Sequence, residues 1–122
     1  MPCDFRTITA AFDLPTNNDI DIDLPEFPAP GVNAGRRAIL MYRAHVTVEG
    51  PFGVVFSGTA TLKAILNGQD IFEQVHSGAD DRCFHKILDS GIVQPANNKL
   101  TLIRNSGDGT IHLSDFVLVY GL

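Results

Sequence analysis

Three aspartates alternate with apolar residues near the start of the chain. Asp19, Asp21 and Asp23 share one face of an extended segment, and the residues between them are isoleucines. Carboxylate oxygens are ligands that calcium prefers. Because side chains two positions apart on a strand lie about 7 Å from one another, a second segment would have to supply further ligands. The pattern offers calcium as a candidate cofactor, and a solvated acidic face that protects a sheet edge is the competing interpretation.

Two polar segments, residues 77–82 and 105–110, could hydrogen-bond the hydroxyl groups of a small ligand. The candidate ligand-binding residues within them are Asp80, Asp81, Arg82, Asn105 and Asp108. Asn and Asp also bond to their own backbone in turns, so a purely structural role is the competing interpretation.

No recognisable catalytic motif is present. The four histidines lack metal-site spacings such as HExxH or HxH, and no GxSxG segment occurs. Cys83 and His85 are two residues apart on a predicted strand, where a thiol and an imidazole are usually just neighbours. A pair of carboxylates brought together from distant strands, as in glycosidases, stays an alternative. We therefore expect the chain not to be an enzyme.

The two cysteines, Cys3 and Cys83, are far apart in the sequence and form no CxxC pair. This spacing argues against a zinc or redox site. No secretion signal is visible at the N-terminus, so we expect a cytoplasmic protein, or one released without a classical signal, with two reduced thiols. A bridge between the two cysteines stays open.

The charge distribution argues against two classes of partner. The net charge is −5, and the only adjacent basic pair is Arg36-Arg37. A nucleic-acid partner is not expected, because there is no basic stripe. A membrane partner is not expected either, because no apolar stretch approaches the roughly 20 residues of a spanning helix.

The composition favours strands and turns. The 122 residues fit a single domain, 1–122, and they include eleven Asp but only three each of Glu, Lys and Gln. Polar helix formers are thus scarce, whereas Gly, Pro, Asn and Asp together number 36. We predict an all-β, antiparallel two-sheet β-sandwich of jelly-roll type with about nine short strands.

Alternating hydrophobicity places the strands. The strongest local signal is Asn67-Gly68, whose residue types suit the positive φ angles of a type I′ hairpin. The proline-rich segment 25–35 is expected to form a loop along a sheet edge. The predicted strands are 7–14, 19–24, 38–48, 54–57, 59–66, 71–75, 83–88, 91–93, 100–104 and 111–120.

The second half of the chain resembles the galactose-binding-like β-sandwiches found as carbohydrate-binding modules. The resemblance rests on an order of elements: ATLKAILNGQ at 60–69 with its Asn-Gly hairpin, NNKLTL at 97–102 and the closing strand IHLSDFVLVY at 111–120. Ala96 or Asn97 stands where that family usually has Gly in its "G-x-N-x-L-x-L" segment. The resemblance implies a sandwich fold and a carbohydrate partner.

We therefore expect a non-catalytic carbohydrate-binding module or lectin-like protein. The chain has no Trp and only two Tyr, so stacking on a sugar ring would fall to Tyr42, Tyr120 or an exposed Phe. Residues 38–42 and 116–120 are apolar on both faces, as strands at a subunit contact are. The alternative is thus a structural or assembly sandwich that oligomerises through sheet faces without a small ligand. In either case we expect a homo-oligomer.

Overall fold

The computed structural model describes residues 3–14, 20–78 and 82–122, with side chains outside 9–21. The regular secondary structure of the described residues consists of strands and one short 3₁₀ turn, Pro51–Gly53, joined by loops. The strands are β1 (Cys3–Leu14), β2 (Ile20–Asp23), β3 (Ile39–Glu49), β4 (Val55–Ser57), β5 (Thr59–Leu66), β6 (Gln69–Ser77), β7 (Arg82–Ile87), β8 (Leu100–Gly107) and β9 (Thr110–Gly121).

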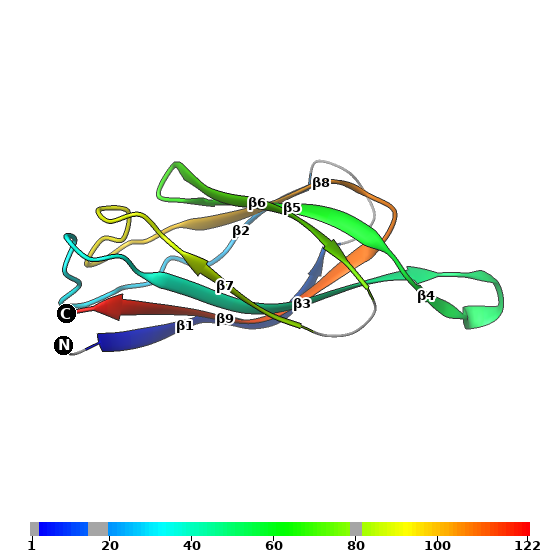
Figure 1. Ribbon diagram of the computed structural model, residues 1–122, viewed down its shortest axis with the longest axis horizontal. Coiled ribbons are helices and arrows are strands. Elements are labelled where there is room, and N and C mark those ends of the chain that lie inside the picture. The colour runs from blue at the N-terminus through cyan, green and yellow to red at the C-terminus, as the bar shows by residue number, and fades with distance from the viewer. Residues whose placement is uncertain (1–2, 15–19, 79–81) are drawn as a thin grey trace.

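Two antiparallel sheets pack face to face (Figure 1). The first has the order β1-β9-β3, and the outer edge of β3 pairs with both β7 and β4. β7 pairs with Ile39–Ala44 and β4 with Thr47–Glu49, so the two short strands follow one another along the same edge. The second sheet has the order β2-β8-β5-β6. The predicted antiparallel β-sandwich is therefore confirmed.

Alternation along the strands builds the core between the sheets. In β5, Ala60, Leu62, Ala64 and Leu66 are buried, whereas the residues between them are partly exposed. β3 repeats the pattern, with Leu40, Tyr42, Ala44 and Val46 buried. A strand with one face in the core and one face toward solvent has this pattern, because successive side chains point to opposite sides. The side chains on the outward face of β3 are therefore at least partly accessible to solvent and to a ligand.

The predicted Asn-Gly hairpin is confirmed. Asn67 and Gly68 join β5 to β6 with φ angles of 53° and 81°. The Asn67 side chain also donates a hydrogen bond to the Ile92 carbonyl oxygen at 2.8 Å. That contact belongs to the segment 91–93, where the prediction of a strand is wrong. Ile92 and Val93 are buried in a loop, so their apolar character reflects core coverage without strand pairing.

The proline-rich segment runs as a loop, as predicted, and the buried Asn98 amide contributes to holding it, together with backbone hydrogen bonds from Phe27, Ala29 and Asn33. Asn98 is fully buried, and its Nδ2 donates to the carbonyl oxygens of Phe27 at 3.1 Å and Gln94 at 2.7 Å. Its Oδ1 accepts hydrogen bonds from the Gln94 N–H at 2.8 Å and from Asn67 Nδ2 at 2.9 Å. One side chain thus ties three loops to the core.

Both cysteines are exposed thiols outside any disulfide, so no Cys3–Cys83 bridge is formed. Cys3 opens β1, while Cys83 lies on β7, which is separated from β1 by β9 and β3 in the same sheet. Among the described residues, no helix is long and apolar enough to cross a membrane.

Candidate binding groove on the outer face of the first sheet

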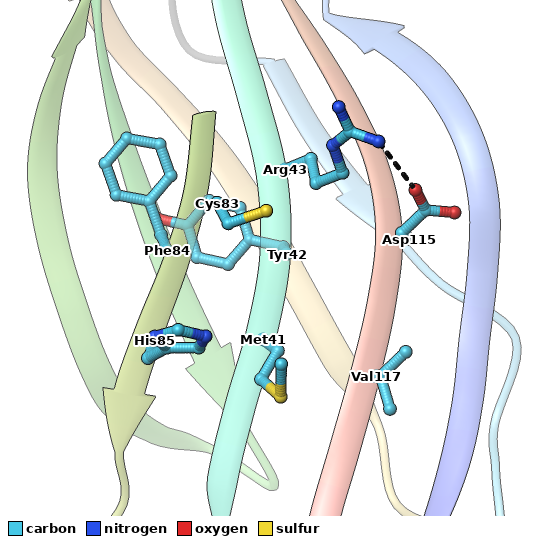
Figure 2. Close-up of a pocket in the computed structure, with 8 residues that line it drawn as sticks. All are labelled: Met41, Tyr42, Arg43, Cys83, Phe84, His85, Asp115 and Val117. Carbon is cyan, nitrogen blue, oxygen red and sulfur yellow. Dashed lines mark ion pairs between the residues drawn. The ribbon is translucent and has the colours of Figure 1, made fainter. Parts of the chain in front are cut away.

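A shallow groove with a volume of about 170 Å³ lies across β3, β7 and β9 on the side of the first sheet that faces away from the core. Figure 2 shows its side chains together. Its surface is lined by Met41, Arg43, Cys83, His85, Asp115 and Val117, and Tyr42 and Phe84 close it from beneath.

Strand register brings the groove residues together. Because Tyr42 points into the core, its neighbours Met41 and Arg43 point outward. Met41 is the register partner of His85 on β7 and of Val117 on β9. Side chains at such paired positions lie side by side on one face of a sheet. Met41 and Val117 therefore form an apolar floor.

A β-bulge places Asp115 at the rim. The register between β3 and β9 shifts between Met41 and Arg43, and Asp115 takes a left-handed φ of 55° at that point. Bulges re-aim side chains, and Asp tolerates this conformation better than most residues. Here the bulge brings Asp115 Oδ2 to 3.9 Å from Arg43 Nη1, the pair joined by the dashed line in Figure 2.

The Arg43–Asp115 pair is accessible to a ligand. The two side chains are 46% and 60% exposed. Exposed pairs of this kind are worth about 0–1 kcal/mol, so either group can exchange part of the contact for a hydrogen bond to a bound molecule. The rim thus offers guanidinium donors and carboxylate acceptors beside an apolar floor.

An aromatic cluster lies beneath the groove floor. The Tyr42 ring stacks on Phe116, Phe84 and Phe72 with centroid distances of 5.0, 5.3 and 5.5 Å. Its hydroxyl lies 3.0 Å from Nε2 of His76, which is also buried. Aromatic packing and one polar contact together fix the Tyr42 ring in a single orientation.

The buried Tyr42–His76 pair is uncharged. Burial, with a smaller contribution from the positive charge of Lys86, lowers the pKa of His76 to about 4. Burial also raises the pKa of Tyr42 well above its usual value. Both groups are therefore neutral at physiological pH, and the charge of the groove comes from its rim.

The predicted acidic face is only partly within the described residues. Asp19 lies outside them, and Asp21 is described only through its backbone pairing with Ile103. Asp23 is exposed, accepts a hydrogen bond from Thr101 Oγ1 at 2.7 Å and pairs with Lys99 Nζ at 3.2 Å. These two contacts lower the pKa of Asp23.

The predicted loop residues do not line the groove. Asp80 and Asp81 lie outside the described residues. Arg82 begins β7, one residue before the groove. Asn105 lies on the opposite sheet and donates to Glu73 Oε1 at 3.2 Å. Asp108 accepts the Thr59 N–H at 2.9 Å, which lowers its pKa and fixes the turn between β8 and β9.

The described residues offer neither a metal cluster nor an exposed tyrosine for stacking on a sugar. Within residues 3–14, 20–78 and 82–122, no group of three or more His, Cys, Asp and Glu could hold a metal ion. The Tyr42 and Tyr120 rings are each 1% exposed, so neither offers its face at the surface. Tyr42 contributes to the groove as its support.

Sequence reasoning missed most of the groove. The outward face of β3, including Met41 and Arg43, is readable from alternation. The pairing of β3 with β7 and β9 cannot be predicted from the sequence in the same way, because both strands are distant from β3 along the chain. The bulge at Asp115 also lacks the glycine that commonly marks a positive φ in a strand.

The comparisons with known proteins concern the fold. No family model matches the sequence, and no curated protein matches it. A CBM36-1 domain of a multidomain xylanase from the hindgut metagenome of Trinervitermes trinervoides is similar in structure, with a TM-score of 0.59, 9% identity and coverage of 99% of this chain and 98% of that one. The family 29 carbohydrate-binding module CBM29_1 from Piromyces equi has a TM-score of 0.53 at 6% identity, over 99% and 93% of the two chains.

A CBM4 structure is also similar. It has a TM-score of 0.56 and 13% identity, over 98% of this chain and 71% of that one. At such identities the shared feature is the fold, and function follows from the site itself. The chain has an antiparallel jelly-roll β-sandwich fold, which it shares with these carbohydrate-binding modules.

Proposed function

We propose that this protein is a non-catalytic carbohydrate-binding domain and that the groove across β3, β7 and β9 is its sugar site. The observation that carries the proposal is an apolar floor next to a charged, half-exposed rim, formed by Met41, Val117, Arg43 and Asp115. The fold shared with carbohydrate-binding modules supports it.

A sugar ring matches this arrangement chemically. One face of a hexopyranose carries C–H groups, which pack well on Met41 and Val117. Its edge carries hydroxyl groups, which accept hydrogen bonds from the Arg43 guanidinium and donate them to the Asp115 carboxylate. The groove volume of about 170 Å³ is below the roughly 300–1,000 Å³ of pockets that hold drug-sized ligands, which suits a ligand of about one ring.

The affinity is expected to be low. No described Trp or Tyr offers its ring face to a sugar, because the chain lacks Trp and both Tyr rings are buried. A monosaccharide of about twelve heavy atoms, at about 0.3 kcal/mol per atom, gains about 4 kcal/mol, which corresponds to a Kd of about 1 mM. Tight binding would need further subsites or several copies of the domain.

The test is NMR titration of the protein with a panel of diverse monosaccharides and short glycans up to about 20 mM, a range that covers a Kd of about 1 mM. Arg43→Ala and Met41→Ala should each weaken binding about tenfold, which corresponds to about 1.4 kcal/mol. Arg37→Ala is the matched control, because Arg37 is an exposed arginine paired with Asp89 outside the groove. No binding across diverse glycans, or equal losses in Arg43→Ala and Arg37→Ala, would reject the proposal.

The same titration tests calcium. If glycan binding persists at full strength in excess chelator, calcium at Asp19, Asp21 and Asp23 has no part in sugar recognition. A loss that is restored by added calcium would instead assign an ion to the site.

A further inference from the structure

An apolar hairpin extends from the sandwich at one end. The arm, residues 50–57, follows β3, turns through the 3₁₀ segment Pro51–Gly53 and returns as β4, and it extends beyond the rest of the molecule (Figure 1). Phe52 is fully exposed, and Val54, Val55 and Phe56 are about half exposed. No charged residue occurs between Glu49 and Lys63. Such a concentration of exposed apolar groups marks an interaction surface.

The arm is an ordered element with its own contacts. The Gly50 N–H donates to the Val54 carbonyl oxygen at 2.6 Å, and β4 pairs with Thr47–Glu49. A Cβ at Gly50 would clash with the Phe56 ring, so this ring packs directly on the glycine. Phe52, in the middle of the turn at the tip of the arm, has a φ of 61°. This left-handed backbone conformation is unusual for a bulky residue.

A second apolar surface lies at the other end of the same sheet. Phe5, Val119, Ile39 and Ile87 are register partners in succession across β1, β9, β3 and β7. We call these four residues the terminal row. Phe5, Ile39 and Ile87 are exposed, and Val119 is partly exposed. Both chain ends lie at this end of the sandwich (Figure 1).

Nearly all exposed large apolar side chains of the described chain fall at these two ends. Four belong to the arm, three to the terminal row and one, Leu122, to the end of the chain beside it, while Val75 is alone on β6. Ile39 and Glu49 are the two ends of β3, about 33 Å apart. The arm therefore cannot reach the terminal row of its own molecule.

We propose that the arm of one copy of this chain docks on the terminal row of the next copy, head to tail. The two Phe and two Val of the arm expose roughly 400 Å², and the terminal row a similar area, so one contact buries roughly 800 Å². A single contact of this size is smaller than the roughly 1,200–2,000 Å² of standard interfaces, so we expect weak association that appears only at high micromolar concentration.

Charge favours a protein occupant over a lipid surface. The charged residue adjoining the arm is Glu49, and the whole chain carries −5. Segments that bind anionic bilayers carry Lys and Arg beside their apolar residues. Docking on the terminal row of a second copy does not require Lys or Arg beside the arm.

The first experiment is sedimentation velocity on the full chain from about 10 to 500 µM, a range suited to a contact near the lower size limit of specific interfaces. The wild type should associate with rising concentration, and Phe52→Asp and Ile87→Asp should each be monomeric throughout. Val75→Asp is the matched control, because Val75 is 64% exposed and Ile87 66%. It should associate as the wild type does.

Mixing the two variants tests the head-to-tail geometry. Phe52→Asp retains the terminal row and Ile87→Asp retains the arm, so an equal mixture should form a one-to-one dimer through the single intact contact. A wild type that is monomeric at about 500 µM would overturn the proposal. So would association of Phe52→Asp alone, which indicates row-to-row packing, or of Ile87→Asp alone, which indicates arm-to-arm packing.

A vesicle assay separates the lipid alternative. Co-sedimentation of the monomeric Ile87→Asp variant with phosphatidylcholine–phosphatidylserine vesicles, lost in Phe52→Asp, would assign the arm to a membrane and overturn the proposal. The sedimentation and vesicle measurements contain no glycan, so their outcome is scored separately from glycan binding, and neither Phe52 nor Ile87 lines the groove.

Discussion

The Tyr42 hydroxyl lies 3.0 Å from Nε2 of His76, between the two sheets and directly beneath the groove floor. It is a polar contact within an aromatic cluster, since Tyr42 stacks on three phenylalanine rings. A buried polar pair of this kind fixes side-chain orientation when both members are satisfied, and it is costly when one is removed.

Replacing Tyr42 by Phe should destabilise the fold and leave the groove surface in place. The substitution removes the hydroxyl and leaves buried Nε2 of His76 without its partner, at a cost of about 1–3 kcal/mol in the free energy of unfolding. Urea unfolding measures the loss. Tyr120→Phe is the control, because the contacts of that hydroxyl with described residues are longer, at 3.4 Å to Asp4 and to Pro30. A loss in Tyr42→Phe no larger than in Tyr120→Phe would contradict the assigned contact.

Stability should fall with acidification between pH 6.5 and 4. Burial, followed by the charge of Lys86, depresses the pKa of His76 from 6.5 to about 4, so in this window the unfolded chain binds a proton that the folded chain does not. Stability is therefore full above pH 6.5 and falls as the pH decreases, by up to about 3 kcal/mol near pH 4. The carboxyl groups of Asp23 and Asp108, whose pKa values are lowered below 3.8, act at lower pH.

Urea unfolding at several pH values, with His76→Gln beside the wild type, isolates this contribution. Gln retains a polar side chain but does not titrate, so the variant should be less stable at pH 7 and should lose less stability on acidification. Equal slopes for the two proteins between pH 6.5 and 4 would show that His76 does not control this dependence.

The sandwich was predictable because its strands carry local signals. Alternation in 59–66 and 38–48 gives the buried face directly, and Asn67-Gly68 gives the hairpin. The segment 91–93 shows the limit of this signal. A short apolar run covers a core equally well from a loop, so periodicity alone cannot separate the two.

The groove was not predictable because it depends on pairing between distant segments. Met41 lies beside His85 and Val117 only after β7 and β9 have paired with β3. Asn105 and Asp108, which sequence chemistry favours, are instead engaged by Glu73 and Thr59. Residue type identifies groups that can bind a ligand, whereas strand register decides which of them share a surface.

Asn98 should be one of the least replaceable polar residues. Its side chain makes four hydrogen bonds while fully buried, so Asn98→Leu would leave the Phe27 and Gln94 carbonyl oxygens and the Asn67 amide without this partner. We expect a loss of about 3 kcal/mol or more, measured by thermal and urea unfolding. The neighbouring Asn97→Gly is the control. Asn97 is exposed with a φ of 58°, which Gly adopts freely, so stability should change by less than about 1 kcal/mol. Similar losses in both variants would contradict this account.

Two substitutions at Asp115 should separate the bulge from its carboxylate. Asp115→Gly adopts the φ of 55° without strain and removes the carboxylate that faces Arg43. Its stability should lie within about 1 kcal/mol of the wild type, because an exposed ion pair contributes little. Its affinity for the bound glycan should nevertheless fall about tenfold, corresponding to about 1.4 kcal/mol.

Asp115→Val retains no carboxylate and is β-branched, so it resists the left-handed conformation and should lose about 1–3 kcal/mol of stability as well. Urea unfolding and NMR titration of the three proteins distinguish these effects. Wild-type affinity in Asp115→Gly would show that the carboxylate does not contact the sugar, and unchanged stability in Asp115→Val would show that the bulge carries no strain.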